Sequence, residues 1–434
     1  MPDVAGRSPG WWVRRFLSVG LVVATLVATA NCGALTRQRP PWSDAQRVLD
    51  RQARAVAEAD PDGYLRTVDP ASPTFRGQQR RLVRNLLRLP LTDFAYRVTA
   101  VRTLGDAQDA PGRVQVTAEL RYRLRGYDRA PVRAREELTL VERRGRWYLT
   151  APPAAAPQGT RQLWEQGDLT VVRGRHSLVL GVGRGTAALR ALAAQADRAV
   201  PAVAALWPHD WEHRVVVEAP ATLRDMAELL DGSAASYRGI AAVTTGQASR
   251  SASVPADRIV INPEAYEALG EDARQVVLTH EATHVATRRH TSASTPMWLS
   301  EGFADWAGYR GAGHDPGHGD SRLVRARLQR IARALTPLVH RQGPPRRLPS
   351  DADFAFSGTD DRLGRAYEGG WLACRMIADQ WGADTLVRFY TAVGAVDGAQ
   401  RHEQAVAAAL RRVLGLTLDE FTARWRSYLL RQLG

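Results

Sequence analysis

The spacing of hydrophobic positions predicts helices followed by strands in the first 150 residues. Residues 43–60 carry apolar side chains at helical spacing, with Pro61 as the stop, and a second, basic helix is predicted over 75–89. Apolar and polar residues then alternate, as in half-buried antiparallel strands, over 94–104, 113–125 and 132–150. The last of these segments contains Gly145, where we expect a tight turn.

Beyond residue 150 the pattern mixes strands with helices and then becomes helical. A Pro/Ala-rich segment, 151–160 (APPAAAPQGT), is the best candidate for a linker. Strand-like segments follow at 169–182, 213–218, 239–244 and 258–262. Helices are predicted at 185–206, 220–230, 271–288, 298–309, 321–335, 366–381, 384–393, 401–413 and 417–432. This order predicts an α+β fold rather than a parallel α/β sheet, with domains at 43–150 and 161–434.

A short apolar run near the N-terminus predicts export from the cytoplasm. Three arginines precede an uncharged stretch over 16–30, which is the layout of a secretory signal. The segment resembles a bacterial lipoprotein signal in which Cys32 carries the lipid, and the alternative is an uncleaved signal-anchor. Both interpretations separate residues 1–32 from a tether over 33–42. Both also place the rest of the chain at the extracytoplasmic face of the cell membrane.

Composition and charge change this picture only in part. A content of 44% hydrophobic and 24% charged residues is typical of a folded soluble protein and argues against a disordered or many-pass membrane chain. The net charge of +14 is regional, since 23 arginines oppose 14 acidic residues over 37–150, whereas 33 oppose 30 over 151–434. No recognition motif accompanies the charge, so we expect no nucleic-acid binding. All basic residues are arginine, which indicates the nucleotide bias of a GC-rich genome.

The strongest chemical signal is the sequence HEATH inside a predicted helix. Its histidines, His280 and His284, are four residues apart, so both imidazoles leave one helix face, one turn apart. This geometry suits two nitrogen ligands on one zinc ion. Glu281 points off that line and could accept a proton from zinc-bound water. The downstream segment WLSEGFADW offers Glu301 as a third ligand and Asp305 as a partner that orients a histidine.

HEATH followed by WLSEGFADW resembles the gluzincin metallopeptidases, the clan of thermolysin and aminopeptidase N, and is closest in style to their bacterial peptidase-MA-like relatives. The resemblance covers about residues 165–434 and implies a zincin-like α+β peptidase domain with Zn²⁺ as its cofactor. The zinc ligands that it implies are His280, His284 and Glu301. It further implies Glu281 as the general base and Asp305 as the support of a zinc histidine. Only 16 residues separate His284 from Glu301, slightly fewer than in the best-known members.

A third segment, AYEGGW at 366–371, resembles the YEKG segment of the aminopeptidase branch. The resemblance implies that Tyr367 donates a hydrogen bond to the tetrahedral intermediate. The chain has no Gly-x-Met-Glu-Asn segment, the feature with which the aminopeptidases bind a free amino terminus. The corresponding edge strand is expected at 239–244, where a substrate backbone could add as another strand. These features favour an endopeptidase.

The helices and strands over 43–150 resemble the cone-shaped domains of the nuclear-transport-factor-like superfamily. Their alternating arginines are interpreted as a solvated sheet face, with contact to an anionic surface, such as lipid headgroups or wall polymer, as the alternative. Cys374 is predicted to be a lone buried thiol. His314 and His318 lie in a Gly-rich segment that we interpret as a surface loop rather than a second metal site.

Together these features predict a membrane-anchored, extracytoplasmic zinc endopeptidase that acts on a peptide or protein substrate. Two alternatives stay open. The zinc fold could be an inert scaffold that binds a component of the cell envelope, or the site could hydrolyse a non-peptide amide.

Overall fold

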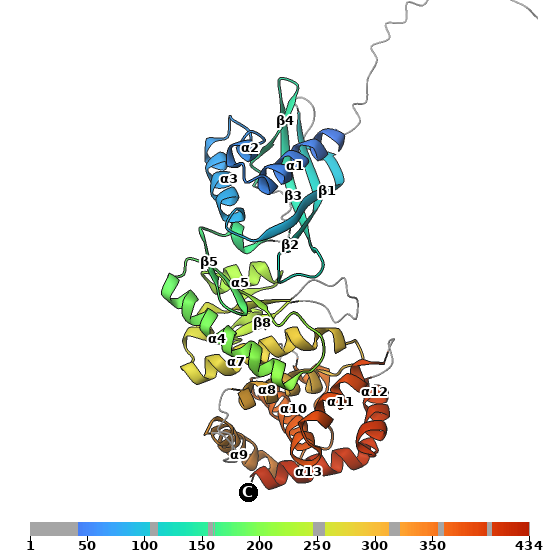
Figure 1. Ribbon diagram of the computed structural model, residues 1–434. Coiled ribbons are helices and arrows are strands. Elements are labelled where there is room, and N and C mark those ends of the chain that lie inside the picture. Colours follow the sequence, from blue (N-terminus) through green and yellow to red (C-terminus); the bar gives the residue numbers. More distant parts are fainter. Residues whose placement is uncertain are drawn as a thin grey trace, which may run out of the picture. The chain divides into compact units, whose positions relative to one another are not determined.

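The structure, a computed structural model, describes residues 42–104, 112–154, 159, 161–245, 257–311, 322–354, 360–396 and 402–433. These residues belong to one compact unit, and they form an α+β fold with 56% helix and two sheets, which confirms the α+β class alone (Figure 1). Among them, no helix is both long and apolar enough to cross a membrane. The predictions for the signal or anchor, the tether, Cys32, His314 and His318 lie outside the described residues.

The first part of the described chain combines three helices with a four-stranded antiparallel sheet. The helices are α1 (Trp42–Ala57), α2 (Pro61–Leu65) and α3 (Pro73–Leu86). The strands, β1 (Leu91–Thr103), β2 (Arg113–Leu124), β3 (Val132–Arg143) and β4 (Arg146–Thr150), lie side by side in chain order. The helix α1 packs on the sheet through apolar residues at helical spacing, among them Ala45, Val48 and Leu49.

Two local predictions in this part have different outcomes. The segment 132–150 turns back on itself at Arg144 and Gly145, whose φ angles of 53° and 74° are the positive values that a two-residue hairpin turn requires. The predicted turn is therefore confirmed. The helix expected over 43–60 ends earlier, at Ala57, and Pro61 begins α2 rather than only stopping α1. Proline fits a first helical turn, and Asp60 caps it by accepting a hydrogen bond from the Gly63 N–H.

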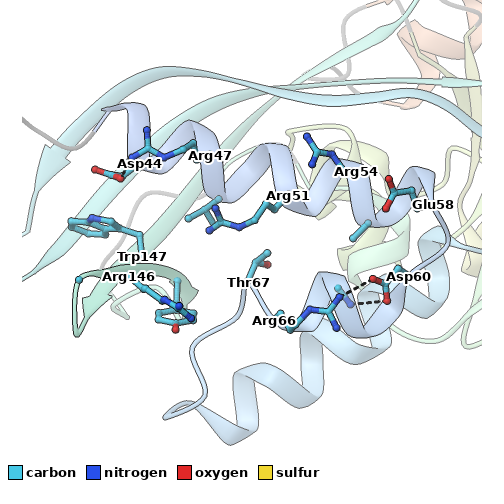
Figure 2. A pocket seen from close by; sticks show the side chains of 15 residues that line it. Asp44, Arg47, Arg51, Arg54, Glu58, Asp60, Arg66, Thr67, Arg146 and Trp147 are labelled. Carbon is cyan, nitrogen blue, oxygen red and sulfur yellow. Dashed lines mark hydrogen bonds and ion pairs between the residues drawn. The ribbon is translucent and has the colours of Figure 1, made fainter.

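The arginines of this part lie mostly at the surface. A groove of about 590 Å³ beside α1 and β4 is lined by five arginines and three acidic residues, and Arg51 and Arg54 extend from α1 in different directions (Figure 2). Asp44 pairs with Arg47, and the Asp60 carboxylate lies 3.0 Å from the Arg66 guanidinium. Acidic residues thus offset part of the groove's positive charge.

A five-stranded mixed sheet begins the rest of the chain. Its strands are β5 (Leu169–Arg173), β6 (Ser177–Val182), β7 (Val215–Ala219), β8 (Ala242–Thr244) and β9 (Arg258–Ile261), in the order β5-β6-β7-β9-β8. The three central strands are parallel and buried, whereas β5 and β8 pair antiparallel at the two edges. The segment predicted over 169–182 is therefore a hairpin of two strands, and the predicted edge strand is the short β8.

Helices alternate with these strands and then form the C-terminal half. They are α4 (Thr186–Leu206), α5 (Leu223–Leu229), α6 (Pro263–Glu267), α7 (Glu271–Thr287), α8 (Met297–Gly311), α9 (Arg322–Gln342), α10 (Asp360–Trp381), α11 (Ala383–Gly394), α12 (His402–Ala409) and α13 (Leu418–Leu433). The helix predicted over 321–335 continues through Pro337, a residue that usually ends a helix. Cys374 is fully buried in α10, as predicted, and its thiol is free among the described residues.

Residues on both sides of the predicted linker contact one another. The guanidinium of Arg258, at the start of β9, donates hydrogen bonds of 2.7 and 2.8 Å to the two carboxylate oxygens of Asp128, and both residues are buried. Leu120 of β2 lies in the same hydrophobic cluster as Leu178 and Leu180 of β6. The boundaries of two separate domains therefore stay a prediction.

Candidate metal centre

Three packed helices position the predicted site. The helix α7 carries HEATH, α8 carries WLSEGFADW, and α8 packs against both α7 and α10. A side chain at Gly308 of α8 would lie 2.9 Å from the Val276 carbonyl oxygen of α7, and one at Gly302 would lie 2.4 Å from the Gly370 carbonyl oxygen of α10. Only glycine permits such close approaches, so these two positions set how near α8 lies to its neighbours.

This packing brings three donor side chains together. The ring Nε2 atoms of His280 and His284 lie 3.1 Å apart. The Glu301 carboxylate oxygens lie 3.3 Å from the His280 Nε2 and 3.5 Å from the His284 Nε2. Neighbouring donors around a tetrahedral ion with bonds of about 2.0–2.1 Å are separated by roughly 3.3 Å. The three residues could therefore hold one metal ion between them, as a group whose ligand atoms all lie within 4.8 Å of one another.

Asp305 binds one of these histidines through the ring nitrogen that faces away from the other donors. Its Oδ1 accepts a hydrogen bond of 2.8 Å from the Nδ1 of His280, which leaves the Nε2 of that ring facing the other donors. Burial alone would lower the pKa of His280, but the carboxylates of Asp305 and Glu301 offset it and raise this pKa well above its ordinary value. Burial alone would raise the pKa of Glu301, but the two neighbouring histidines outweigh it and hold this pKa far below its usual range. The Glu301 carboxylate is thus favoured in its ionised form.

Glu281 lies on the buried side of α7 and is held by the edge strand. Its Oε2 accepts a hydrogen bond of 2.6 Å from the hydroxyl of Thr244, the last residue of β8. The Thr244 hydroxyl also lies 3.2 Å from the Glu281 backbone carbonyl. This carboxylate is therefore oriented by a neighbour other than the three donor residues. The link between β8 and α7 is a contact that the sequence analysis did not foresee.

Tyr367 lies on α10, half-buried, with its ring edge-on to Phe354 at a centroid distance of 5.2 Å. Burial and the carboxylates of Glu301, Asp305 and Glu281 raise the pKa of Tyr367 well above its ordinary value. The phenol therefore stays protonated and can donate a hydrogen bond toward the site.

Arg327 is a site residue that the sequence analysis missed. Its guanidinium donates 2.8 Å hydrogen bonds to Asp305 and to Glu368, and it lies 4.4 Å from the ring centroids of both Tyr309 and Trp371. The side chain is only 3% exposed. Arg327 contacts the Asp305 oxygen that does not contact His280, so it helps to hold Asp305 in place against this histidine. Its burial could have been predicted, because it lies four residues from Ile331 on the apolar face of α9.

Replacing Arg327 with methionine is expected to destabilise both the fold and the metal site. The change leaves Asp305 and Glu368 buried without their positive partner, which costs about 3–5 kcal/mol of unfolding free energy. Loss of this support should weaken metal binding about 10–100-fold. Urea unfolding and competition with a zinc-chelating dye measure the two effects.

Arg333 provides the matched control, since it is an exposed arginine of the same helix. Its change to methionine should leave both quantities close to those of the wild-type protein. Equal effects of the two substitutions would contradict the role assigned to Arg327.

The structure thus brings His280, His284, Glu301 and Asp305 into direct contact, with Glu281 and Tyr367 beside them. Comparison with protein-family models and with curated proteins returned no match to this chain. The chemistry of the site therefore rests on its own residues.

Proposed function

We propose that the chain is a zinc-dependent endopeptidase of the gluzincin type. The observation that carries the proposal is the convergence of His280, His284 and Glu301 at tetrahedral spacing, beside a buried carboxylate that is not one of the donors. Two imidazole nitrogens and one carboxylate oxygen are a donor set suited to Zn²⁺, and three protein ligands leave a fourth position open. Such an open position distinguishes a catalytic zinc site from a structural one.

The side chains around the donors have separate tasks in the proposed reaction. A zinc ion held there would supply an electrophile that polarises a peptide carbonyl and acidifies a water molecule. Glu281, oriented by Thr244, accepts the proton of the attacking water. The phenolic O–H of Tyr367 donates a hydrogen bond to the carbonyl oxygen as negative charge develops there. Asp305 and Arg327 keep the His280 ring in its orientation.

The edge strand supports an endopeptidase in particular. Within the described part of the chain, β8 pairs with β9 alone, and its last residue, Thr244, contacts Glu281. A substrate that adds to this edge is bound through its backbone, which requires no free amino terminus. A peptide bond inside a chain could thus lie across the donor cluster.

We further propose two domains for the whole chain. Residues 161–434 would form a zincin-like domain, and residues 43–150 would form a cone-like domain of the nuclear-transport-factor type. Residues 1–32 would hold both at the extracytoplasmic face of the membrane, as a signal-anchor or through a lipid on Cys32.

Metal removal tests the proposed activity. The purified protein should cleave members of a peptide library at internal bonds, lose this activity with a chelator, and regain it when zinc is added back. Cleavage that survives complete metal removal would refute the zinc mechanism. Zinc binding without cleavage of any peptide would instead favour the inert scaffold.

Replacing Tyr367 with phenylalanine is expected to lower kcat about 10²–10³-fold with a small change in KM, because the lost hydrogen bond forms mainly in the transition state. Steady-state kinetics on the best library peptide measures this split. The zinc content should stay that of the wild type, since His280, His284 and Glu301 supply the proposed ligands. A purely raised KM would show that Tyr367 binds substrate rather than stabilising the intermediate.

A further inference from the structure

A cavity other than the groove beside α1 lies between the first three helices and the four-stranded sheet, and its lining residues are distant in sequence from the metal centre. It has a volume of about 400 Å³, and its lining comes from α1, α2, α3, all four strands and residues 152–154, 159 and 161–165. Five aromatic side chains contribute to the wall: Tyr64, Phe75, Phe94, Tyr96 and Trp164. Ten polar or charged residues lie among them. Aromatic side chains beside polar groups that fix a ligand's orientation are typical of a small-molecule site.

Several polar atoms of this lining are buried without a partner. The Oε1 of Glu136 and the Nε2 of Gln52 have no hydrogen-bond partner within the described part of the chain. Their residues are 8% and 1% exposed, respectively. A buried polar group without a partner costs about 1–3 kcal/mol. A bound molecule that donates a hydrogen bond would supply a partner for Glu136.

The acidic residues that line this cavity indicate the charge of the molecule that would bind there. Two carboxylates, of Glu136 and Glu165, belong to the lining. Burial and the Glu165 carboxylate raise the pKa of Glu136 well above its ordinary value, against the opposing effect of Arg161. Burial also raises the pKa of Glu165, although its carboxylate accepts a hydrogen bond of 2.9 Å from the Gln162 N–H. The ionised form of each carboxylate is thus disfavoured where it lies, and a positive ligand would favour it.

The positive and remaining acidic residues of the lining are already engaged or more exposed. Arg161 is 41% exposed and lies 3.8 Å from Glu228, and Glu137 is bound by Gln115, Thr117 and Arg135. The half-buried Arg81 completes the charged lining. The most deeply buried charge without a full set of partners is therefore that of Glu136.

We propose that this cavity binds a small organic cation, a primary ammonium ion with an apolar body, whose N–H groups donate to the Oε1 of Glu136. The aromatic rings would surround the cationic head, Glu136 and Glu165 would balance its charge, and the apolar body would contact Phe75 and Phe94. Cation–π attraction and a desolvated carboxylate act together in such a site. This ligand site is independent of the proposed peptidase activity.

Binding of 2-phenylethylammonium to the full-length protein in detergent micelles tests the proposal. Calorimetric titration, corrected by a titration of empty micelles, should show saturable binding of this probe. The neutral alcohol 2-phenylethanol and the anion 3-phenylpropanoate should bind at least about tenfold more weakly, because only the cation offsets the charge of the two carboxylates.

Three variants locate the binding. Glu136→Gln should weaken the probe's binding about tenfold or more, and Glu165→Gln provides a second test if the first variant fails to fold by circular dichroism. Glu119→Gln, on the opposite face of the same sheet, should bind as the wild type does. His284→Ala should also bind normally, which separates this site from the metal centre. No saturable binding, equal binding of the alcohol or the anion, or equal effects at Glu136 and Glu119 would overturn the proposal.

Discussion

Glu281→Gln is expected to reduce peptide hydrolysis by about 10²–10⁴-fold while the protein keeps its zinc. Glutamine retains the shape of the side chain, and its amide oxygen can still accept the Thr244 hydrogen bond, which is 2.6 Å long in the wild type. It cannot take up a proton from water at neutral pH, so only the proton transfer is lost. The measurements are kcat/KM on the best library peptide and zinc content by elemental analysis.

Glu271→Gln is the control for this experiment, because Glu271 lies exposed in the first turn of the same helix. It should match the wild type in both measurements. Unchanged hydrolysis in Glu281→Gln would refute the general-base role. Loss of zinc together with activity would show instead that Glu281 binds the metal, contrary to the geometry in which Thr244 engages its carboxylate.

His284→Ala is expected to abolish both zinc binding and hydrolysis. The substitution removes one of three donors and leaves only His280 and Glu301, whose closest atoms lie 3.3 Å apart. Two protein ligands hold zinc far more weakly than three, so the content should fall from about one ion per chain to nearly none. Elemental analysis after dialysis against metal-free buffer, together with the peptide assay, measures both losses.

His340→Ala separates this effect from the general loss of an imidazole, since His340 is an exposed residue at the end of α9. It should keep full zinc content and activity. If His284→Ala retained its zinc at wild-type affinity, the ion would have to bind elsewhere and the proposed centre would be wrong.

The pattern of the chain was sufficient for the local parts of the site. The i,i+4 spacing of His280 and His284 predicted two rings on one helical face, and both lie on α7 with their Nε2 atoms 3.1 Å apart. Helical periodicity is a short-range property, so one segment contains all the information that it needs. The resemblance implied that Asp305 orients one of the two histidines, and a contact of 2.8 Å identifies this histidine as His280.

Long-range packing was not readable in the same way. The strand β9 lies between β7 and β8 although β8 precedes it in the chain, and this order brings Thr244 to Glu281 across 37 positions. Arg327 contacts Asp305 and Glu368 from α9, a helix that the hydrophobic pattern predicted to end at residue 335, before Pro337. Neither contact has a signature in its own segment, because each depends on where a distant element packs.

The sequence by itself therefore determined the α+β class, the helices that carry the site, and the candidate donors His280, His284 and Glu301. These follow from residue types at fixed spacing, which local geometry translates directly into shared faces. Only the tertiary structure decided that Thr244 orients Glu281, that Arg327 supports Asp305, and that Glu136 is buried beside an aromatic cavity. Such contacts join residues that the chain keeps far apart, and burial of the surrounding apolar surface, rather than any local preference, brings them together.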